Sequence, residues 1–592
     1  MTKEYKREEL AESGRRRRIL PVLVAAAIAA ACALTGCGKQ AVAPAPSPSP
    51  QQPEEMLVGY FEGIARGSYD SLYDMLSESS RQAISRDGYV EKNERIYEGI
   101  EAKNLDIGIV AVTELEALEG EEGRWQVAYR CKMDTVAGAI VYDNQAIGLR
   151  NGEGKCLLDW STEDIFPQLG PGDKVRVNTL RAERGQIFDR NGQMLAGKGV
   201  ASAIGLVPGK MEQDGGLGLQ QISQLLEMPV ETIEKRLNAS YVKEDTFVQL
   251  KIVPKTQQEL KDALLLVPGV KIIDAQVRHY PLGEKAAHLV GYVQSINAEE
   301  LAERKEQGYH TNSVLGKTGL EKIYEEQLRA VDGVEILIVD AGGQAKVTLA
   351  KVDKRDGHDL VLTVDARLQS QLYDQFSMDK GCSVAMNPKT GEVLALVSTP
   401  SYDNNAFVLG LSESQWKRVN EDENLPLYNR FKAALCPGSV FKGVTAAVGM
   451  ETGAIDPAED FGYSGLKWRK DDSWGGYYVK TTKAYKEAAN LENALVYSDN
   501  IYFAKAALKM GGERFAEELI RLGFEERIPF EYGLYSSILS ATETFTSEIQ
   551  LADSGFGQGE VLTNPVHLAS IYSAFVNGGD MPKPHLVQDG FG

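Results

Sequence analysis

Ser439 and Lys442 constrain the fold of this chain more than any other feature of its sequence. They form a Ser-x-x-Lys set that directly follows a Pro437-Gly438 turn. Residues three apart lie on one face of a helix, so a helix over 439–452 would place the lysine amine beside the serine hydroxyl. Serine is a weak nucleophile near neutral pH, and a neutral lysine is one of the few bases that can activate it. The spacing therefore predicts acyl transfer through a covalent acyl-enzyme.

The start of the same helix would also serve the reaction. A helix N-terminus offers partial positive charge and free N–H groups, so the Ser439 N–H is a candidate donor to an oxyanion. Lys442 must be neutral to act as a base, so we expect burial or a cationic neighbour to lower its pKa. Because single Ser-x-x-Lys sets occur in many helices, the prediction needs a second motif.

The second motif is Ser498-Asp499-Asn500. Ser498 could relay a proton between Lys442 and the leaving or attacking group, and Asn500 could hold the substrate amide and bind Lys442. Taken alone, the tripeptide also fits a helix N-cap, a position that favours Ser, Asp and Asn. A Ser-x-x-Lys, Ser-Asp-Asn and Lys-Thr-Gly set is typical of penicillin-binding proteins and class A β-lactamases.

The third motif of that set is out of place. Two Lys-Thr-Gly strings exist, at 317–319 and 389–391, and both precede Ser439. The resemblance implies a functional copy after Asn500, on the strand beside the cleft, so we interpret neither string as part of the site. Residues 557–560 and 564–569 resemble the segment that shortly precedes that strand. We therefore expect the last domain to be incomplete, and the chain as written to be inactive or poorly folded there.

Residues 1–36 are interpreted as a targeting segment. A basic block at 15–18 precedes an apolar run over 19–34, which is shorter than the roughly 20 residues a membrane-spanning helix needs. The following Leu34-Thr35-Gly36-Cys37 resembles the bacterial lipobox, which implies cleavage before Cys37 and lipidation of its thiol. The alternative to a lipidation signal is a plain membrane anchor in which Cys37 occurs by chance. Both predict a chain tethered to the cell membrane on its extracytoplasmic face, where lipidation gives stable anchoring.

The remaining sequence predicts a multidomain α+β protein, since 592 residues exceed one ordinary domain. Residues 37–53 are rich in Pro, Ala and Ser and predict an extended linker. Over 54–167 helical patterns precede alternating strands, which favours a small α+β domain. With Trp160 and the 165–167 and 172–173 strings, it resembles the cone-like nuclear-transport-factor-2-like N-terminal domain of methicillin-resistance-type penicillin-binding proteins. We expect a spacer or binding role for it.

The middle region, 168–357, carries spaced motifs that resemble the elongated pedestal, or dimerisation, domain of class B penicillin-binding proteins. The motifs lie at 184–192, 278–281, 288–292 and 319–325. From 358 to 592 the chain resembles a transpeptidase domain with a serine β-lactamase-like fold. It opens with a predicted strand at 359–365, a helix at 366–376 and a hairpin at 383–397.

These resemblances identify the chain as a member of the class B penicillin-binding proteins. They imply a peptidoglycan DD-transpeptidase in which Ser439 attacks the penultimate D-Ala carbonyl of a stem peptide, and an amine of a neighbouring stem then accepts the acyl group. They also imply that β-lactams acylate the same serine, with the low affinity of the antibiotic-resistance type, and that a separate glycan polymerase is a partner in building the cell wall. The alternatives are a β-lactamase or D,D-carboxypeptidase, and a catalytically inactive binding or sensor protein.

Composition excludes some other functions. A net charge of −20 argues against nucleic acid as a partner. The cysteines form no Cys-x-x-Cys and the six histidines no cluster, so we expect neither a metal site nor a cofactor. Cys131 and Cys156 fall in one predicted domain and could pair after export. Cys436, just before Ser439, is interpreted as a small buried hydrophobe.

Overall fold

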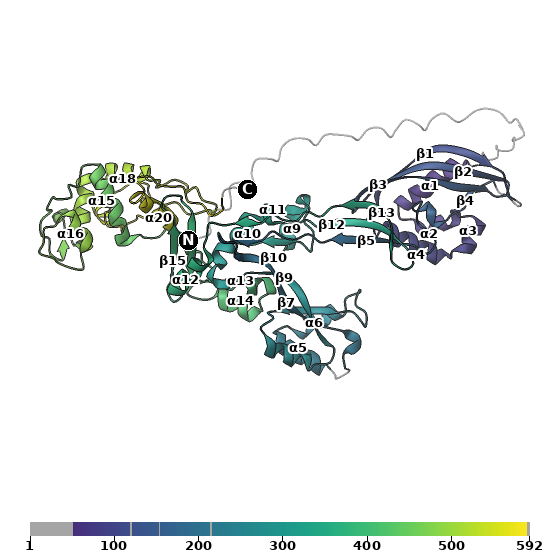
Figure 1. Ribbon diagram of the computed structural model, residues 1–592, viewed down its shortest axis with the longest axis horizontal. Coiled ribbons are helices and arrows are strands. Elements are labelled where there is room, and N and C mark those ends of the chain that lie inside the picture. Colours follow the sequence, from purple (N-terminus) through teal and green to yellow (C-terminus); the bar gives the residue numbers. More distant parts are fainter. Residues whose placement is uncertain (1–50, 119–120, 153, 213–215, 589–592) are drawn as a thin grey trace, which may run out of the picture.

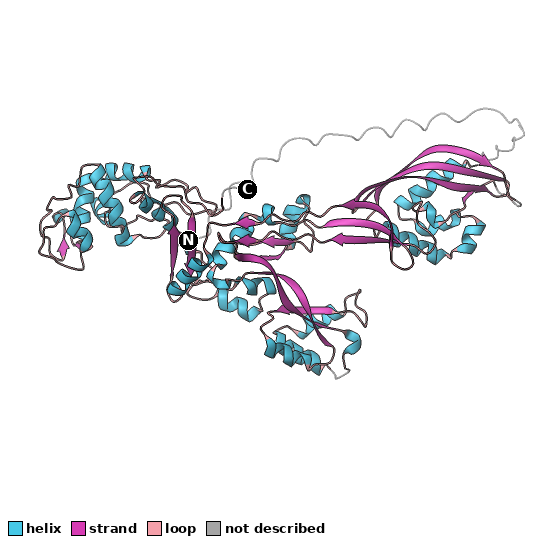
Figure 2. Cartoon of the chain, viewed as in Figure 1, coloured by secondary structure: helices cyan, strands magenta, loops and turns pink. Residues whose placement is uncertain are grey.

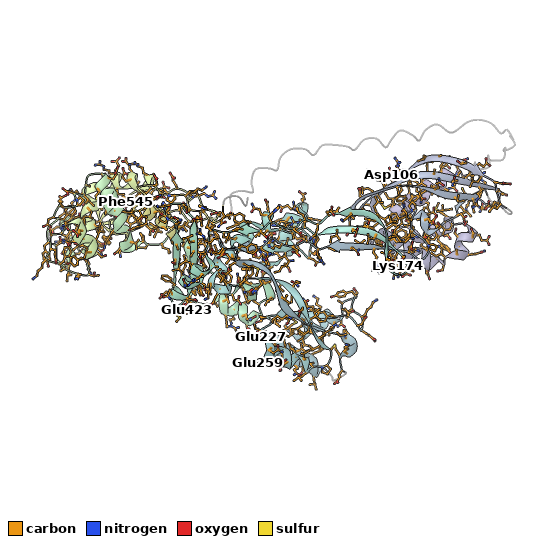
Figure 3. The ribbon with its side chains drawn as sticks, in the orientation of Figure 1. Asp106, Lys174, Glu227, Glu259, Glu423 and Phe545 are labelled. Atoms are coloured by element: carbon orange, nitrogen blue, oxygen red, sulfur yellow. The ribbon has the colours of Figure 1, made fainter. Side chains whose placement is uncertain are left out.

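The computed structural model describes residues 51–118, 121–152, 154–212 and 216–588. The expected signal segment, Cys37 and most of the predicted linker therefore lie outside the described residues. The described chain is an elongated α+β molecule (Figure 1), and helices and strands are mixed along most of its length (Figure 2). Asp106 and Phe545, labelled in Figure 3, lie toward its two ends. No helix within the described ranges is both long and apolar enough to cross a membrane.

The N-terminal part packs short helices against one antiparallel sheet, whose strands follow chain order. Its elements are α1 (Pro53–Ala65), α2 (Tyr69–Leu72), α3 (Glu78–Ala83), α4 (Arg86–Tyr97), β1 (Lys103–Leu115), β2 (Gly123–Thr135), β3 (Gly138–Arg150) and β4 (Cys156–Leu158). The expected order of helices before strands is observed. Helix α4 begins on the Ser85 cap, carries a Gly and is mostly polar.

The core of this part is aromatic. Tyr60, Phe61, Tyr89 and Tyr129 are almost fully buried, and the Trp160 ring lies 5.1 Å from that of Tyr89. Packing of large rings in edge contacts stabilises such a core beyond simple area burial. The core also encloses the two cysteines that could have paired. Cys131 and Cys156 are both buried and both free, so the alternative of a disulfide between them is wrong.

A three-stranded antiparallel sheet joins the N-terminal part to the middle of the molecule. It has the order β13 (Ala345–Val352), β12 (Gly333–Val339) and β5 (Lys174–Leu180). Ile336 and Ile338 of β12 are buried in the same hydrophobic cluster as the N-terminal core. Lys346 and Asp173 add an ion pair of 2.5 Å within this region. The core is therefore continuous from the N-terminal part into the sheet.

A side lobe projects from the long axis beside this sheet (Figure 1). Strand β7 (Met194–Leu206) pairs with both β8 (Val248–Val253) and β9 (Val270–His279). The helices of the lobe are α5 (Leu217–Leu226), α6 (Val230–Leu237) and α7 (Gln258–Leu265). Glu227, labelled in Figure 3, accepts a hydrogen bond of 2.6 Å from Ser414, which ties the lobe to α14 (Glu413–Asn420).

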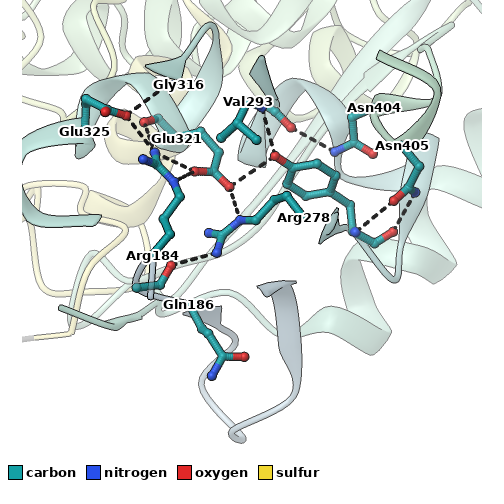
Figure 4. A network of polar contacts seen from close by, with 12 residues as sticks. Arg184, Gln186, Arg278, Val293, Gly316, Glu321, Glu325, Asn404 and Asn405 are labelled. Atoms are coloured by element: carbon teal, nitrogen blue, oxygen red, sulfur yellow. Dashed lines mark hydrogen bonds and ion pairs between the residues drawn. The ribbon is translucent and has the colours of Figure 1, made fainter. Parts of the chain in front are cut away.

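Three of the motifs of the middle region meet at one buried network of charges (Figure 4). Arg184 donates to Glu321 at 2.8 Å and to Glu325 at 2.7 Å, while Arg278 donates to Glu321 at 2.7 Å. Glu321 is completely buried. A buried carboxylate is stable only when it is paired and hydrogen-bonded, so these motifs depend on one another although they are far apart in sequence.

Short elements surround this network and lead into the C-terminal part. They are β6 (Ile187–Phe188), α8 (Ala287–Val290), β10 (Val293–Ser295), α9 (Ala298–Arg304), β11 (Val314–Gly316), α10 (Gly319–Ile323), α11 (Glu325–Leu328) and α13 (Asn404–Leu409). Strand β14 (Leu360–Val361) pairs in parallel with β6. Backbone hydrogen bonds from the C-terminal part therefore reach directly into the middle region.

The C-terminal part begins with the predicted elements, although the strand expected at 359–365 is reduced to the two residues of β14. Helix α12 (Ala366–Phe376) and the hairpin of β15 (Gly381–Met386) with β16 (Val393–Thr399) are confirmed. A two-stranded ribbon and helices follow, namely α15 (Phe441–Glu451), β17 (Lys467–Trp468), β18 (Val479–Lys480), α16 (Leu491–Val496), α17 (Asn500–Met510), α18 (Gly512–Arg521), α19 (Glu548–Ser554) and α20 (Pro565–Ala574). Helices α15 and α17 share one core through Phe441, Val444 and Ala507, which brings their first turns together.

Candidate active site

The Ser439 turn is more tightly wound than the sequence predicts. Residues Gly438–Val440 form a 3₁₀ turn, and the α-helix begins only at Phe441. Ser439 therefore lies just before α15, and Lys442 is its second residue. The lysine amine still reaches the serine hydroxyl, at 3.2 Å between Nζ and Oγ. The expected side-by-side placement of the two residues is observed.

Two glycines give this turn its shape. Gly438 has φ +57°, a left-handed conformation that strongly favours glycine. Its N–H donates to the Gly557 carbonyl at 2.8 Å. A β-carbon on Gly557 would lie only 2.1 Å from the Gly438 oxygen, so no larger residue fits there. In sequence, the segment around Gly557 only resembles the one that precedes the Lys-Thr-Gly strand. The structure places it directly beneath the turn that carries Ser439.

Ser498 and Asn500 complete a cluster around the lysine amine. Lys442 Nζ donates to Ser498 Oγ at 2.9 Å, to the Ser498 carbonyl at 2.7 Å and to Asn500 Oδ1 at 2.6 Å. Ser498 Oγ in turn lies 3.1 Å from Ser439 Oγ. All four residues selected from the two motifs therefore meet at one point.

Asp499, the middle residue of the second motif, has a structural role. Asp499 caps α17 by accepting from the Ile501 N–H at 2.9 Å, so the N-cap interpretation of the tripeptide is also correct. Its second oxygen accepts from Tyr485 at 2.8 Å, and the Tyr485 ring stacks on Tyr497 at 4.5 Å between centroids. Ser498, just before the cap, has φ +54°, a strained conformation for a residue with a side chain. This cap and stack hold the strained turn that presents Ser498.

Burial sets the charge state of the lysine. Lys442 is only 2% exposed. Removal from water disfavours the charged amine and lowers the pKa of Lys442 to about 8, although the nearby Asp499 carboxylate opposes this shift. The expectation of a lowered pKa is confirmed, and its cause is burial rather than a cationic neighbour. About a tenth of the lysine is then neutral at pH 7.

The hydroxyl that would react remains accessible. Ser439 is exposed, while Ser498 and Asn500 are half-buried. The Asn500 amide is held by its Nδ2, which donates to the Lys480 carbonyl at 2.9 Å. A primary amide has two N–H donors, so one of them is left to bind a carbonyl group of a substrate. The arrangement offers a nucleophile, a buried base, a hydroxyl relay and an amide that can orient a peptide.

The two Lys-Thr-Gly strings lie in other settings. Lys317 forms an ion pair with Glu300 at 2.5 Å, and Gly319 is packed against Gly291. The second string, 389–391, forms the turn between β15 and β16, as predicted. Within the described residues neither string hydrogen-bonds to the Ser439 cluster. The expected incompleteness of the last domain stays a prediction.

The interpretation of Cys436 is wrong. This cysteine is exposed rather than buried. Its Sγ lies 3.2 Å from the Gly557 carbonyl, the same oxygen that accepts the Gly438 N–H. It lies at an exposed position just before the 3₁₀ turn that carries Ser439. Nothing in the local sequence pattern distinguishes this from the buried position that is usual for cysteine.

Three family models match the chain in sequence. Residues 52–173 match an NTF2-like N-terminal transpeptidase domain, 179–362 a penicillin-binding protein dimerisation domain, and 381–590 a penicillin binding protein transpeptidase domain. Together they cover most of the described chain.

Curated relatives agree with these models. Penicillin-binding protein 3 of Bacillus subtilis is 36% identical over 558 residues, which cover 94% of this chain and 81% of the relative. Peptidoglycan D,D-transpeptidase MrdA of Acinetobacter baumannii is 29% identical over 437 residues, 72% of this chain and 65% of that protein. The chain thus spans just under two thirds of the length of this second relative.

Solved structures show a similar fold. One of them is a complex between the penicillin-binding protein PBP2 and MreC from Helicobacter pylori. A chain of that complex matches with a TM-score of 0.55 and 26% identity, and the match covers 71% of the present chain and 79% of the matched chain. PBP2 of the same organism solved alone matches with a TM-score of 0.53 and 24% identity, over 70% of this chain and 80% of its own, a likeness that concerns the fold alone.

Proposed function

This chain belongs to the penicillin-binding protein family, alongside class B members, and on that premise we propose that Ser439 is the nucleophile of a peptidoglycan DD-transpeptidase. The observation that carries the assignment is the position of the Ser439 hydroxyl, 3.2 Å from the Lys442 amine and 3.1 Å from the Ser498 hydroxyl. A nucleophile within hydrogen-bonding reach of its base is the geometry that covalent catalysis requires.

The first half-reaction acylates the enzyme. Neutral Lys442 takes the hydroxyl proton of Ser439 as Oγ forms a bond to the carbonyl carbon of the penultimate D-Ala. The Ser439 N–H, near the positive end of α15, supports the negative charge on the carbonyl oxygen. The bond to the terminal D-Ala nitrogen then breaks, and Ser498 passes the proton from Lys442 to that nitrogen. The products are free D-Ala and an ester on Ser439.

The second half-reaction transfers the peptide. An amine of a neighbouring stem attacks the ester carbonyl and loses its proton through Ser498 to Lys442. The bond to Oγ breaks, Ser439 regains its proton, and a cross-linking amide is formed. Asn500 serves both halves by orienting the donor peptide through its free N–H and by accepting from Lys442. Because β-lactams carry a strained amide in place of the scissile bond, they acylate the same oxygen.

Covalent labelling tests this assignment. We expect a fluorescent penicillin to label the full chain, and Ser439→Ala to abolish the label. Mass spectrometry of the labelled peptide should place the adduct on Ser439. Labelling that persists in the alanine variant, or an adduct on another residue, would contradict the proposal.

Product analysis separates the proposed reaction from its rivals. With a pentapeptide donor and a separate amine acceptor, a transpeptidase forms the cross-linked amide, whereas a D,D-carboxypeptidase releases only the hydrolysed tetrapeptide. A β-lactamase turns over penicillin instead of retaining it. A binding or sensor protein would retain the label but form neither peptide product.

Attachment to the outer face of the cell membrane through Cys37 is part of the same proposal. The Leu34-Thr35-Gly36-Cys37 string supports it. Radiolabelled palmitate should be incorporated into the full chain and not into Cys37→Ala. We also propose a low β-lactam affinity of the resistance type and a separate glycan polymerase as partner. A slow acylation rate and co-purification with a polymerase would support these two points.

A further inference from the structure

A short ribbon of two strands lies beside the Ser439 cluster. Strands β17 and β18 pair antiparallel, with Trp468 opposite Val479 and Lys467 opposite Lys480. Val479 is almost fully buried, and Trp468 packs 5.5 Å from the Trp474 ring in the same core. Because side chains alternate between the faces of a strand, Lys467 and Lys480 lie on the other face, and both are exposed.

The two lysines form an unusual pair. Residues directly opposite in an antiparallel pair have their β-carbons roughly 5 Å apart, and like charges in such positions destabilise the pair. Within the described residues neither Lys467 nor Lys480 has a carboxylate at ion-pair distance. The Lys467 amine lies 5.0 Å from the Tyr478 ring, which offers only weak compensation. The arrangement therefore places two exposed positive charges opposite each other on one face of the ribbon.

Two other cations around the ribbon have carboxylate partners. Arg469, on the same face, forms an ion pair with Asp472 at 2.5 Å. Lys470 pairs with Glu548. Lys483 lies over the Tyr497 ring, whose hydroxyl donates to Glu487 at 3.1 Å. Lys483, and Lys505 at 5.5 Å from the Trp468 ring, form no ion pair within the described residues, so the ribbon region carries excess positive charge in a chain whose net charge is −20. Lys467 and Lys480 place two of these charges directly opposite each other.

The position of the pair connects it to the reaction. The Lys480 carbonyl accepts from Asn500 Nδ2, and Asn500 Oδ1 accepts from Lys442. The ribbon is therefore hydrogen-bonded directly to the Asn500 amide, which would orient the donor peptide. A peptide held by Asn500 would lie beside this ribbon, and the anionic groups of a peptide are carboxylates.

We propose that Lys467 and Lys480 form a subsite for a carboxylate on the donor peptide, remote from the bond that Ser439 attacks. This inference rests on the proposed function and adds a preference for donors with a free acid over donors in which that acid is an amide. A bound carboxylate would also relieve the repulsion between the lysines. The subsite selects substrates and takes no part in bond making.

Binding to an inactive protein tests the subsite directly. The full chain with Ser439→Ala would be titrated calorimetrically with two synthetic stem peptides that end in D-Ala-D-Ala and differ only in one internal carboxylate, free or amidated. We expect the acid to bind about tenfold more tightly than the amide at low salt. The preference should shrink in 0.5 M salt, where the Debye length is only about 4 Å.

The matched variants separate local charge from overall charge. Lys467→Gln with Lys480→Gln should abolish the preference for the acid. Lys380→Gln with Lys389→Gln removes two exposed lysines near the β15–β16 hairpin and should leave the preference unchanged. The first pair should not lower the melting temperature, because it removes a repulsive contact. Three results would overturn the inference. The protein with both lysines could bind the acid and the amide equally, the preference could survive in Lys467→Gln/Lys480→Gln, or neither peptide could bind.

Penicillin labelling distinguishes a failure of the subsite from a failure of the proposed function. If labelling of Ser439 fails in the unaltered chain, the proposed function fails. If labelling is normal and the acid preference is absent, only the subsite fails.

Discussion

At the scale of single residues, the chemistry of this molecule depends on the charge of one amine. Lys442 was selected because of its spacing from Ser439, and that spacing is enough to predict their contact. Its pKa could not be predicted in the same way. The value of about 8 results from burial beneath α17 and from the opposing charge of Asp499, both of which come from tertiary packing.

The pKa of Lys442 predicts a pH dependence of acylation. The reactive form is the neutral amine, so the rate of penicillin acylation should rise with pH and level off above about pH 8. Stopped-flow labelling between pH 6 and 9.5 measures this profile. Lys442→Arg should reduce the rate about a thousandfold or more, because an arginine stays charged at every accessible pH. A flat profile in the unaltered protein would rule out Lys442 as the base.

A second residue-scale prediction concerns Asp164. Burial in the aromatic N-terminal core raises the pKa of Asp164 to about 7, although the Ser161 N–H partly offsets this. The folded state thus holds a proton that the unfolded chain releases near pH 4. Stability is fully present below pH 4 and is lost as pH rises toward 7 and above. Calorimetry should show a lower melting temperature at pH 8 than at pH 5, and Asp164→Asn should remove this difference. An equal dependence in the asparagine variant would contradict it.

At the scale of elements, the periodic patterns predicted the elements that open the C-terminal part better than the turn that carries the site. Helix α12 and the β15–β16 hairpin match their predicted ranges because their apolar and turn residues follow a clear period. Helix α4 and strand β3 show no such clear period, since α4 is largely polar and β3 contains several polar and small residues. The 3₁₀ turn at Gly438–Val440 was missed, because it depends on a contact with the distant Gly557.

The contact between Gly557 and Gly438 yields a prediction at this scale. Gly557→Ala would place a methyl group against the Gly438 carbonyl and shift the turn that carries Ser439. We expect penicillin acylation to slow by at least about tenfold while the fold is retained, as measured by labelling rate and circular dichroism. The control is Gly578→Ala. Gly578 also has positive φ, but a β-carbon there would meet nothing within 4 Å. If both variants are acylated equally slowly, backbone strain rather than the clash is responsible.

At the scale of the whole molecule, the buried charge network decides how the parts are held together. Arg184, Arg278 and Glu321 come from three separate motifs, and each motif alone predicted only a family resemblance. The network lies where β14 of the C-terminal part meets β6 of the middle region. Tyr280 donates to Glu321 at 3.1 Å and exchanges hydrogen bonds with Asn405 of α13 through its backbone, so the network also contacts the C-terminal part.

Removing one carboxylate should destabilise this junction. Glu321→Gln leaves Arg184 and Arg278 buried without their shared charge, which should cost about 3 to 5 kcal/mol of stability. Glu62→Gln, in the exposed pair with Arg66 on α1, makes the same substitution and should have a much smaller effect. Chemical denaturation followed by the fluorescence of bound penicillin would report on the junction. Equal effects of the two substitutions would show that the network is not structural.

The sequence by itself determined the family, the order of the parts and the meeting of Ser439 with Lys442. That last contact needs only the geometry of a single helical turn, which three residues of spacing specify. Tertiary structure alone decided the remaining contacts. Ser498 and Asn500 reach Lys442 because α15 and α17 share a hydrophobic core, Gly557 supports the turn from more than a hundred residues away, and burial sets the pKa of the lysine. Local spacing fixes contacts within one turn, whereas contacts between distant segments follow from how their apolar faces pack.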